Sequence, residues 1–151
     1  MKITDLRIRE LEGVLEHPDP FWEERLVRPI DISPAYRAEG ASYSNSLGDG
    51  RYAMRSAFLE VHTDEGVTGI GISAGIQDAP EVASAILDHL KQVVIGRDPL
   101  DNERHWHEMW RPKLVGRRGI TTRVIGVLDI ALWDLKGKVA NMPLYKLLGG
   151  F

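Results

Sequence analysis

The sequence predicts an α+β fold, in which a three-stranded antiparallel sheet is followed by a bundle of about three helices. Up to residue 73, apolar and polar residues alternate with a period of two in several segments, as in strands with one solvated face. After residue 78, apolar residues recur every three or four positions, as in amphipathic helices. Strands followed by helices favour a sheet with helices packed on one side.

Two segments predict the first strands. In segment 2–13, Leu6 and Ile8 alternate with arginines. In a segment from about 53 to 63, apolar side chains share one side and polar side chains the other. The apolar ones are Ala57, Leu59 and Val61. Both patterns indicate strands that bury one face.

The second strand and a third one, at 67–73, predict a hairpin. The loop between them reads TDEG, and its glycine can take a positive φ. In the third strand Ile70 and Ile72 share one face, and Gly69 and Gly71 alternate with them. A phosphate-binding glycine turn needs a helix start directly after it, which this strand lacks. We therefore interpret these glycines as room for close packing.

The first two helices have marked ends. One begins near Asp78, with a proline and a glutamate in its first turn, and ends before Gly96. Its expected apolar side is Val82, Ile86, Leu90 and Val93. The next begins near Asp98 and ends near Arg111, because Pro112 cannot continue it. Its expected apolar side includes Trp106, Met109 and Trp110.

The third helix is predicted over about 121–140. Its expected apolar side is Ile125, Leu128, Leu132, Leu135 and Val139. Asp134 and Lys138 stand four residues apart, in the order that favours an ion pair on an exposed helix face.

His105 and His107, in the second helix, are the residues that most resemble a metal motif. Residues two apart on a helix point about 200° from each other, so the two rings cannot share one ion. We interpret them as two partly exposed histidines.

The composition excludes several classes of protein. The net charge of −3 provides no broad positive field, so we expect no nucleic-acid partner. The absence of cysteine excludes disulfides and thiolate chemistry and fits a reducing compartment, which makes the cytoplasm the default location. No run approaches the roughly 18 to 20 apolar residues of a membrane helix, so we expect no membrane partner.

The segment 14–50 shows no sustained periodicity and is longer than ordinary loops of about 12 to 15 residues. It mixes aromatic residues with arginines and glutamates, a combination suited to binding a polar ligand. A surface excursion without a ligand is the alternative.

The third helix carries a motif that resembles a known family. The stretch DIALWDLKGK at 129–138, followed by PLYKLLG at 143–149, resembles the first motif of the mandelate racemase and muconate lactonizing enzyme family of the enolase superfamily. Val124 and Val127 depart from it, because the family usually has small residues there. The order of the other predicted elements resembles the family's N-terminal capping domain.

The resemblance implies a chain that continues into a TIM barrel, which lies outside these 151 residues. Residues 1–140 are then the capping domain, with 14–50 as a substrate-lid loop, and 141–151 are a linker into the missing barrel. In the family, a lysine or histidine base on the barrel removes the proton α to a carboxylate, and Mg²⁺ stabilises the product. We expect Mg²⁺ in the complete enzyme and none bound by this chain alone, and we assign no catalytic or metal residue.

The resemblance gives the capping loops a role in shaping the substrate pocket. The stretch FWEERLVRPIDISPAYR resembles the corresponding loop of acid-sugar dehydratases of the rhamnonate type. The residues expected to contact hydroxyls or a carboxylate are Trp22, Arg25, Arg28 and Arg37, and secondarily Tyr52 and Arg55. For each, a solvated or stacking side chain is the alternative.

We expect an isolated capping domain of an enzyme acting on a small carboxylate or sugar acid, catalytically silent alone. Dehydratase, racemase and cycloisomerase activities all stay open. A cap without its barrel should expose apolar surface and self-associate, so we expect a homo-oligomer. The alternatives are a free-standing binding module of the same fold, and a subunit that pairs with a separately encoded barrel.

Overall fold

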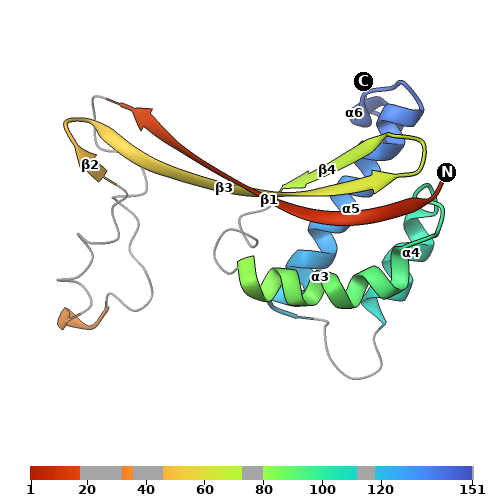
Figure 1. The fold of residues 1–151 in the computed structure, drawn as a ribbon, viewed down its shortest axis with the longest axis horizontal. Coiled ribbons are helices and arrows are strands. Elements are labelled where there is room, and N and C mark those ends of the chain that lie inside the picture. Colours follow the sequence, from red (N-terminus) through yellow and green to blue (C-terminus); the bar gives the residue numbers. More distant parts are fainter. Residues whose placement is uncertain (18–31, 36–45, 73–79, 112–117, 151) are drawn as a thin grey trace. The chain divides into compact units, whose positions relative to one another are not determined.

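The computed structural model describes residues 1–17, 32–35, 46–72, 80–111 and 118–150. The elements within these ranges are β1 (Ile3–Glu16), β2 (Ser46–Gly48), β3 (Arg51–Thr63), β4 (Thr68–Ile72), α3 (Pro80–Val94), α4 (Asn102–Trp110), α5 (Ile120–Val139) and α6 (Leu144–Leu147). Strands precede helices, which confirms the predicted α+β class (Figure 1). The chain divides into a larger unit, Met1–Glu10 with Ser56–Phe151, and a smaller unit, Leu11–Arg55.

The sheet is built around β3. Strand β1 pairs with β3, β2 pairs antiparallel with the start of β3, and β4 pairs antiparallel with its second half. The β3–β4 register runs from Phe58 opposite Ile72 to His62 opposite Thr68. Gly66 in the connecting turn has a φ of 79°. The predicted hairpin and its positive-φ glycine are therefore confirmed, and β2 is a short strand that the sequence did not predict.

The smaller unit contains the ends of the two long strands. Strand β1 continues to Glu16 and so extends into the segment predicted as loop 14–50, which also contains β2, whereas β3 begins at Arg51, just after that segment. The His17 amide donates a hydrogen bond to the Gly50 carbonyl oxygen at 2.7 Å. An isolated two-stranded ribbon is only marginally stable in water. Strand β2 adds further pairing at the start of β3, opposite Arg51 and Tyr52.

The core of the larger unit lies between the sheet and the helices α3, α4 and α5, which cover one face of it (Figure 1). Ala57, Leu59 and Val61 of β3 are all buried there, as the alternation predicted. Ile3 and Leu6 of β1 join the same cluster. Burying such side chains contributes roughly 1.5 to 3 kcal/mol each for the larger ones, so this face holds the larger unit together.

Two glycines allow α5 to lie directly on β4. Gly69 and Gly71 form the side of β4 that faces the helix, and both are buried. A methyl group at Gly69 would overlap the carbonyl oxygen of Ala131, and one at Gly71 would overlap that of Val127. The interpretation of these glycines as room for close packing is confirmed.

The apolar side chains of β4 lie on the opposite face. Ile70 is 44% exposed and Ile72 is 57% exposed. The strand thus packs its glycine face inward and leaves its isoleucine face toward solvent. The close approach of the α5 backbone therefore decides which face of β4 points inward. The glycines are buried, and the larger isoleucine side chains are not.

The buried stripe of α3 includes Leu90, as predicted, but elsewhere it is displaced by one residue from the predicted stripe. Val82, predicted to be apolar and inward, is 47% exposed, and Ile86 and Val93 are only partly buried. The fully buried residues of α3 are Ala83, Leu87, Leu90 and Val94. Both sets recur at helical spacing, so the pattern alone did not distinguish them. The prediction took the larger Val82 as the first inward residue, whereas the smaller Ala83 is the one that is buried.

The other two long helices follow the prediction more closely. Helix α4 begins at Asn102, four residues after the expected start near Asp98, and ends at Trp110, one residue before the expected boundary, with Arg111 as its C-cap. Helix α5 covers Ile120–Val139 and buries the predicted Ile125, Leu128, Leu132 and Leu135. Val139, the last member of the predicted stripe, is exposed. Helix α6 lies within the predicted linker 141–151.

The outer edges of β1 and β4 are each covered at one or two residues. Beside β1, the Ile3 amide donates to the Arg97 carbonyl oxygen at 2.9 Å, and the Gly96 amide donates to Ile3 at 2.8 Å. Beside β4, the Ile70 amide donates to Asp134 Oδ2 at 2.8 Å, and Lys138 Nζ donates to the Thr68 carbonyl oxygen at 2.8 Å.

Asp134 and Lys138 also pair with each other at 2.6 Å, which confirms the predicted i,i+4 pair and gives it a second role. Open edges are where sheets from different chains can join, so these side chains of α5 close one such edge. In the part of the chain that is described, no helix is both long and apolar enough to cross a membrane.

Candidate functional site

Most of the predicted substrate-binding residues lie outside the described ranges. Trp22, Arg25, Arg28 and Arg37 are in 18–31 and 36–45, and their predicted roles stay predictions. Tyr52 and Arg55 lie on β3 within the smaller unit.

Tyr52 and Arg55 have different environments. Tyr52 is 6% exposed, opposite Ser46 of β2 in the strand register. The Arg55 side chain is exposed, and its Nε lies 3.1 Å from Glu12 Oε1 of β1. An exposed ion pair of this kind contributes about 0 to 1 kcal/mol, so it does not lock the guanidinium. A ligand anion could therefore replace Glu12 as the partner of Arg55, whereas the ring of Tyr52 is largely inaccessible.

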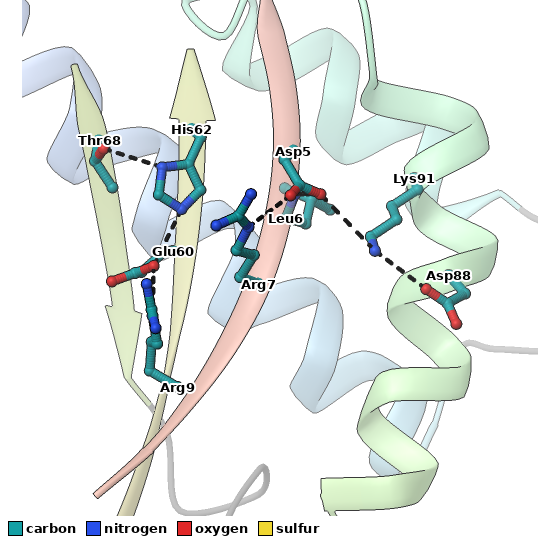
Figure 2. A network of polar contacts seen from close by, with 9 residues as sticks. All are labelled: Asp5, Leu6, Arg7, Arg9, Glu60, His62, Thr68, Asp88 and Lys91. Carbon is teal, nitrogen blue, oxygen red and sulfur yellow. Dashed lines mark hydrogen bonds and ion pairs between the residues drawn. The ribbon is translucent and has the colours of Figure 1, made fainter. Parts of the chain in front are cut away.

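A second polar cluster crosses three strands of the larger unit, on the face away from the helices (Figure 2). Arg9 Nε of β1 donates to Glu60 Oε2 of β3 at 3.0 Å. His62 Nε2 lies 3.0 Å from the same oxygen, and His62 Nδ1 lies 3.3 Å from Thr68 Oγ1 of β4. Because an ionised carboxylate only accepts, Nε2 carries the proton that His62 donates to Glu60.

The carboxylates of this face are stabilised in their charged form. Burial would raise the pKa of Glu60, but hydrogen bonds from Arg9 and His62 outweigh it and hold the pKa below its ordinary value. A hydrogen bond from Arg7 is the largest influence on Asp5 and lowers its pKa, with burial opposing it and the Leu6 amide assisting. Figure 2 also shows Lys91 of α3 beside Asp5.

This arrangement suits cross-strand bonding better than catalysis. A carboxylate with a lowered pKa is a weak general base near neutral pH, and Glu60 already accepts two hydrogen bonds. Within the described ranges, no three histidine or acidic side chains converge as metal ligands would. These residues therefore do not fit a Mg²⁺ ion, which prefers several oxygen ligands in an octahedron.

The two histidines of α4 differ more than predicted. His105 is 0% exposed and donates from Nε2 to the Asp98 carbonyl oxygen at 2.7 Å, whereas His107 is exposed. The expectation that both are partly exposed is wrong for His105. Its position on the inner side of α4, next to the buried Met109, puts it in the core, and the carbonyl of Asp98 satisfies one ring nitrogen.

Asp129 on α5 is a half-buried carboxylate for which the described residues provide no hydrogen-bond donor. Burial raises its pKa. It stands first in the DIALWDLKGK motif, but the sequence gave no reason to single it out within that motif.

The comparisons with known proteins match these elements to one family. Residues 49–149 match the family model described as "Mandelate racemase / muconate lactonizing enzyme, N-terminal domain". The chain belongs to this family. The predicted resemblance is thus confirmed over most of the chain, including all of β3, β4 and α3 to α6.

Its relatives include acid-sugar dehydratases. The chain is 41% identical over 127 residues to a Caldivirga maquilingensis protein named "Putative L-rhamnonate dehydratase", a match that covers 83% of this chain and 29% of the relative. It is 42% identical over 92 residues to the D-mannonate dehydratase of Rhizorhabdus wittichii, covering 61% of this chain and 23% of the relative.

Solved structures give the same result for the fold. An enolase-superfamily member from Polaromonas sp. JS666 is 27% identical, with a TM-score of 0.64, and the match covers 100% of this chain and 34% of that one. The chain thus spans less than a third of the length of the curated relatives that it matches.

Proposed function

We propose that this chain is the N-terminal capping and substrate-specificity domain of a Mg²⁺-dependent acid-sugar dehydratase of the enolase superfamily. Residues 1–140 form the cap, the segment 14–50 acts as the substrate lid, and 141–151 lead into a C-terminal barrel. The observation that carries the proposal is the 41% identity to the Caldivirga relative over 127 residues. The match to a D-mannonate dehydratase supports the same substrate class.

The division of labour follows from the residues. Dehydration of a sugar acid removes the proton α to the carboxylate and expels the β-hydroxyl as water. The barrel would supply the base and the metal ligands, since the described part of this chain does not fit a metal ion. The contribution of this chain is to orient the substrate and to keep water out of the pocket.

The lid carries the specificity in this proposal. Arg25, Arg28 and Arg37 would bind the carboxylate or hydroxyl groups of the substrate, because a guanidinium offers planar, paired donors. Trp22 would cover an apolar face of the sugar chain. Arg55 can join them, since its exposed pair with Glu12 is easily exchanged.

Exposed apolar side chains near the C-terminus support a missing partner domain. Four of them follow one another at intervals of three residues: Val139, Met142, Tyr145 and Leu148. Exposed apolar side chains that gather in a patch mark interaction sites in soluble proteins. A barrel that follows directly in the chain would cover them.

The test is a chimera in which this chain replaces the matching N-terminal part of the Caldivirga relative. With Mg²⁺, we expect the chimera to dehydrate at least one of L-rhamnonate, D-mannonate and D-galactonate. We expect the 151-residue chain alone to dehydrate none of them. Substituting Arg28 with alanine should raise KM of the chimera more than it lowers kcat.

Two results would contradict the proposal. Metal-dependent dehydration by the 151-residue chain alone would show a complete active site within it. A folded chimera that turns over no sugar acid would favour a binding module of the same fold. The reading frame downstream of codon 151 provides a second test, because a barrel with a Lys-x-Lys pair and three acidic ligands should follow there.

A further inference from the structure

One side of α5 carries a glycine at which an added Cβ would meet open space. One turn after another, it presents Gly126, Asp129, Ile130 and Trp133, which we call the Gly126 face. Asp129 and Ile130 follow Gly126 by three and four residues, and Trp133 follows them by four and three, so all four lie on one side of the helix. The buried side chains of α5 lie on the other side.

Gly126 stands inside a 20-residue helix, and none of the residues that the structure describes explains a glycine there. A Cβ built there meets no atom within 4 Å. Gly69 and Gly71 differ, because a Cβ at either would collide with the backbone of α5. Glycine weakens a helix interior relative to alanine, so a glycine that none of the described residues requires points to close approach by something else.

The neighbours of Gly126 lack partners that such an approach could provide. Asp129 is half-buried, and no donor from the described residues reaches it. A carboxylate that loses water without gaining a hydrogen bond is unfavourable, and burial accordingly raises the pKa of Asp129. Ile130 is 46% exposed beside it.

The nearest described lysine on this side of the helix is engaged elsewhere. Lys136 Nζ donates to the Leu100 carbonyl oxygen at 3.2 Å and lies 5.0 Å from the centre of the Trp133 ring. These contacts are with the Leu100 carbonyl and the Trp133 ring, and not with Asp129. The Gly126 face thus combines exposed apolar surface at Ile130 with open space beside the backbone of Gly126. It also carries the Asp129 carboxylate, to which none of the described residues donates a hydrogen bond.

We propose that the Gly126 face is the docking surface for the C-terminal part of the complete enzyme. A segment of that part packs against the backbone at Gly126 and donates an arginine or lysine N–H to Asp129. The occupant follows from length and charge: the match to this chain covers only 29% of the Caldivirga relative and 34% of the Polaromonas neighbour, and Asp129 requires a cationic or N–H donor.

This inference rests on the proposed function, and the experiment separates the two. Gly126→Leu and Asp129→Asn are introduced into the 151-residue chain and into the chimera with the Caldivirga relative. Ser84→Leu, at an exposed position of α3, and Glu103→Gln, at an exposed position of α4, are the matched controls. The readout is the thermal midpoint of each protein, together with the number of unfolding transitions.

In the isolated chain, we expect Gly126→Leu to raise the midpoint or leave it unchanged, which also shows that the variant folds. In the chimera, we expect the same substitution to lower the midpoint by about 5 °C or more, or to split one transition into two. Asp129→Asn should act in the same direction with a smaller shift. The two controls should change the midpoint of the chain and of the chimera equally.

An unchanged midpoint of the chimera with Gly126→Leu overturns the docking surface. Self-association of the isolated chain that Gly126→Leu abolishes, with an unaffected chimera, also overturns it, because the occupant is then a second copy. A chimera that unfolds as one unit and responds to Gly126→Leu, but dehydrates no sugar acid, leaves the docking surface in place while the proposed function fails.

Discussion

The two sides of helix α5 treat glycine in opposite ways. On the inner side, Gly69 and Gly71 of β4 are required, because any Cβ would enter the backbone of the helix. On the outer side, a Cβ at Gly126 would meet open space. This glycine lowers helix stability relative to alanine, and no contact with the described residues requires it. Gly69 and Gly71 thus allow a contact within this chain, and Gly126 would allow the contact that we propose with another part of the enzyme.

The comparison separates stability from binding. Substitutions on the inner side should destabilise the chain whatever surrounds it. Substitutions on the outer side should be neutral or stabilising in the isolated chain and should matter only in the complete protein. The following predictions test that separation, from the largest expected effect to the smallest.

Gly71→Ala should lower the free energy of unfolding by about 3 kcal/mol, because α5 must move away from β4 to admit the methyl group. Urea denaturation followed by circular dichroism measures it. Gly13→Ala is the control, since a Cβ at Gly13 meets no atom within 4 Å. Equal stability of the two variants would show that β4 and α5 are not in close contact.

Asp134→Ala should cost about 1 kcal/mol, because the Ile70 amide and Lys138 both lose a hydrogen-bond partner at the margin between the two sides. Asp88→Ala, on α3, removes a comparable exposed pair with Lys91 and should cost less. Hydrogen exchange of the Ile70 amide provides the specific readout. Its protection should fall only in the Asp134 variant.

Gly126→Ala should raise the stability of the isolated chain by about 0.8 kcal/mol, the difference in helix propensity between the two residues. The same denaturation experiment measures it. Destabilisation by this substitution would mean that the outer side is already occupied within the chain, and it would remove the contrast between the two sides.

Asp129→Asn should change stability by only a few tenths of a kcal/mol, with a characteristic pH dependence. The folded state raises the pKa of Asp129, so ionisation of this group disfavours folding. Below about pH 3.9, the ordinary pKa of aspartate, the wild type and the variant should be equally stable. The variant should become the more stable one as the pH rises through the raised pKa. Denaturation curves at pH 3.5 and pH 7 provide the check.

The sequence predicted the elements that depend on local pattern. The alternation of Ala57, Leu59 and Val61 fixed the buried face of β3, and Pro112 fixed the end of α4. The family motif in α5 led to the correct family. These features follow from spacing and backbone chemistry, which a single sequence contains.

Features that depend on a tertiary neighbour were missed. The stripe of α3 shifted because Ala83, a small residue, fits beneath the sheet where Val82 was expected. His105 is buried because a carbonyl oxygen of Asp98, distant in pattern but close in space, accepts its N–H. No periodicity reveals such partners.

The candidate site was predictable only in part. Arg55 is exposed and Tyr52 is largely buried, but the ligand-binding roles of both residues, like those of the arginines of 14–50, stay predictions. Asp129 lies in the family motif, but the sequence assigned it no role. Only the structure shows that no described residue donates a hydrogen bond to its carboxylate. Electrostatic need is a property of the fold, and the motif records only the residue type.

The protection of the β4 edge has a consequence for the synthesis of the protein on the ribosome. The Ile70 amide and the Asp134 carboxylate that covers it are 64 residues apart. At about 5 to 20 residues per second, the ribosome therefore releases the strand roughly 3 to 13 s before the aspartate that shields it. During that interval the nascent hairpin is open to pairing with neighbouring nascent chains on the same messenger RNA, and a chaperone that shelters extended peptides would protect it.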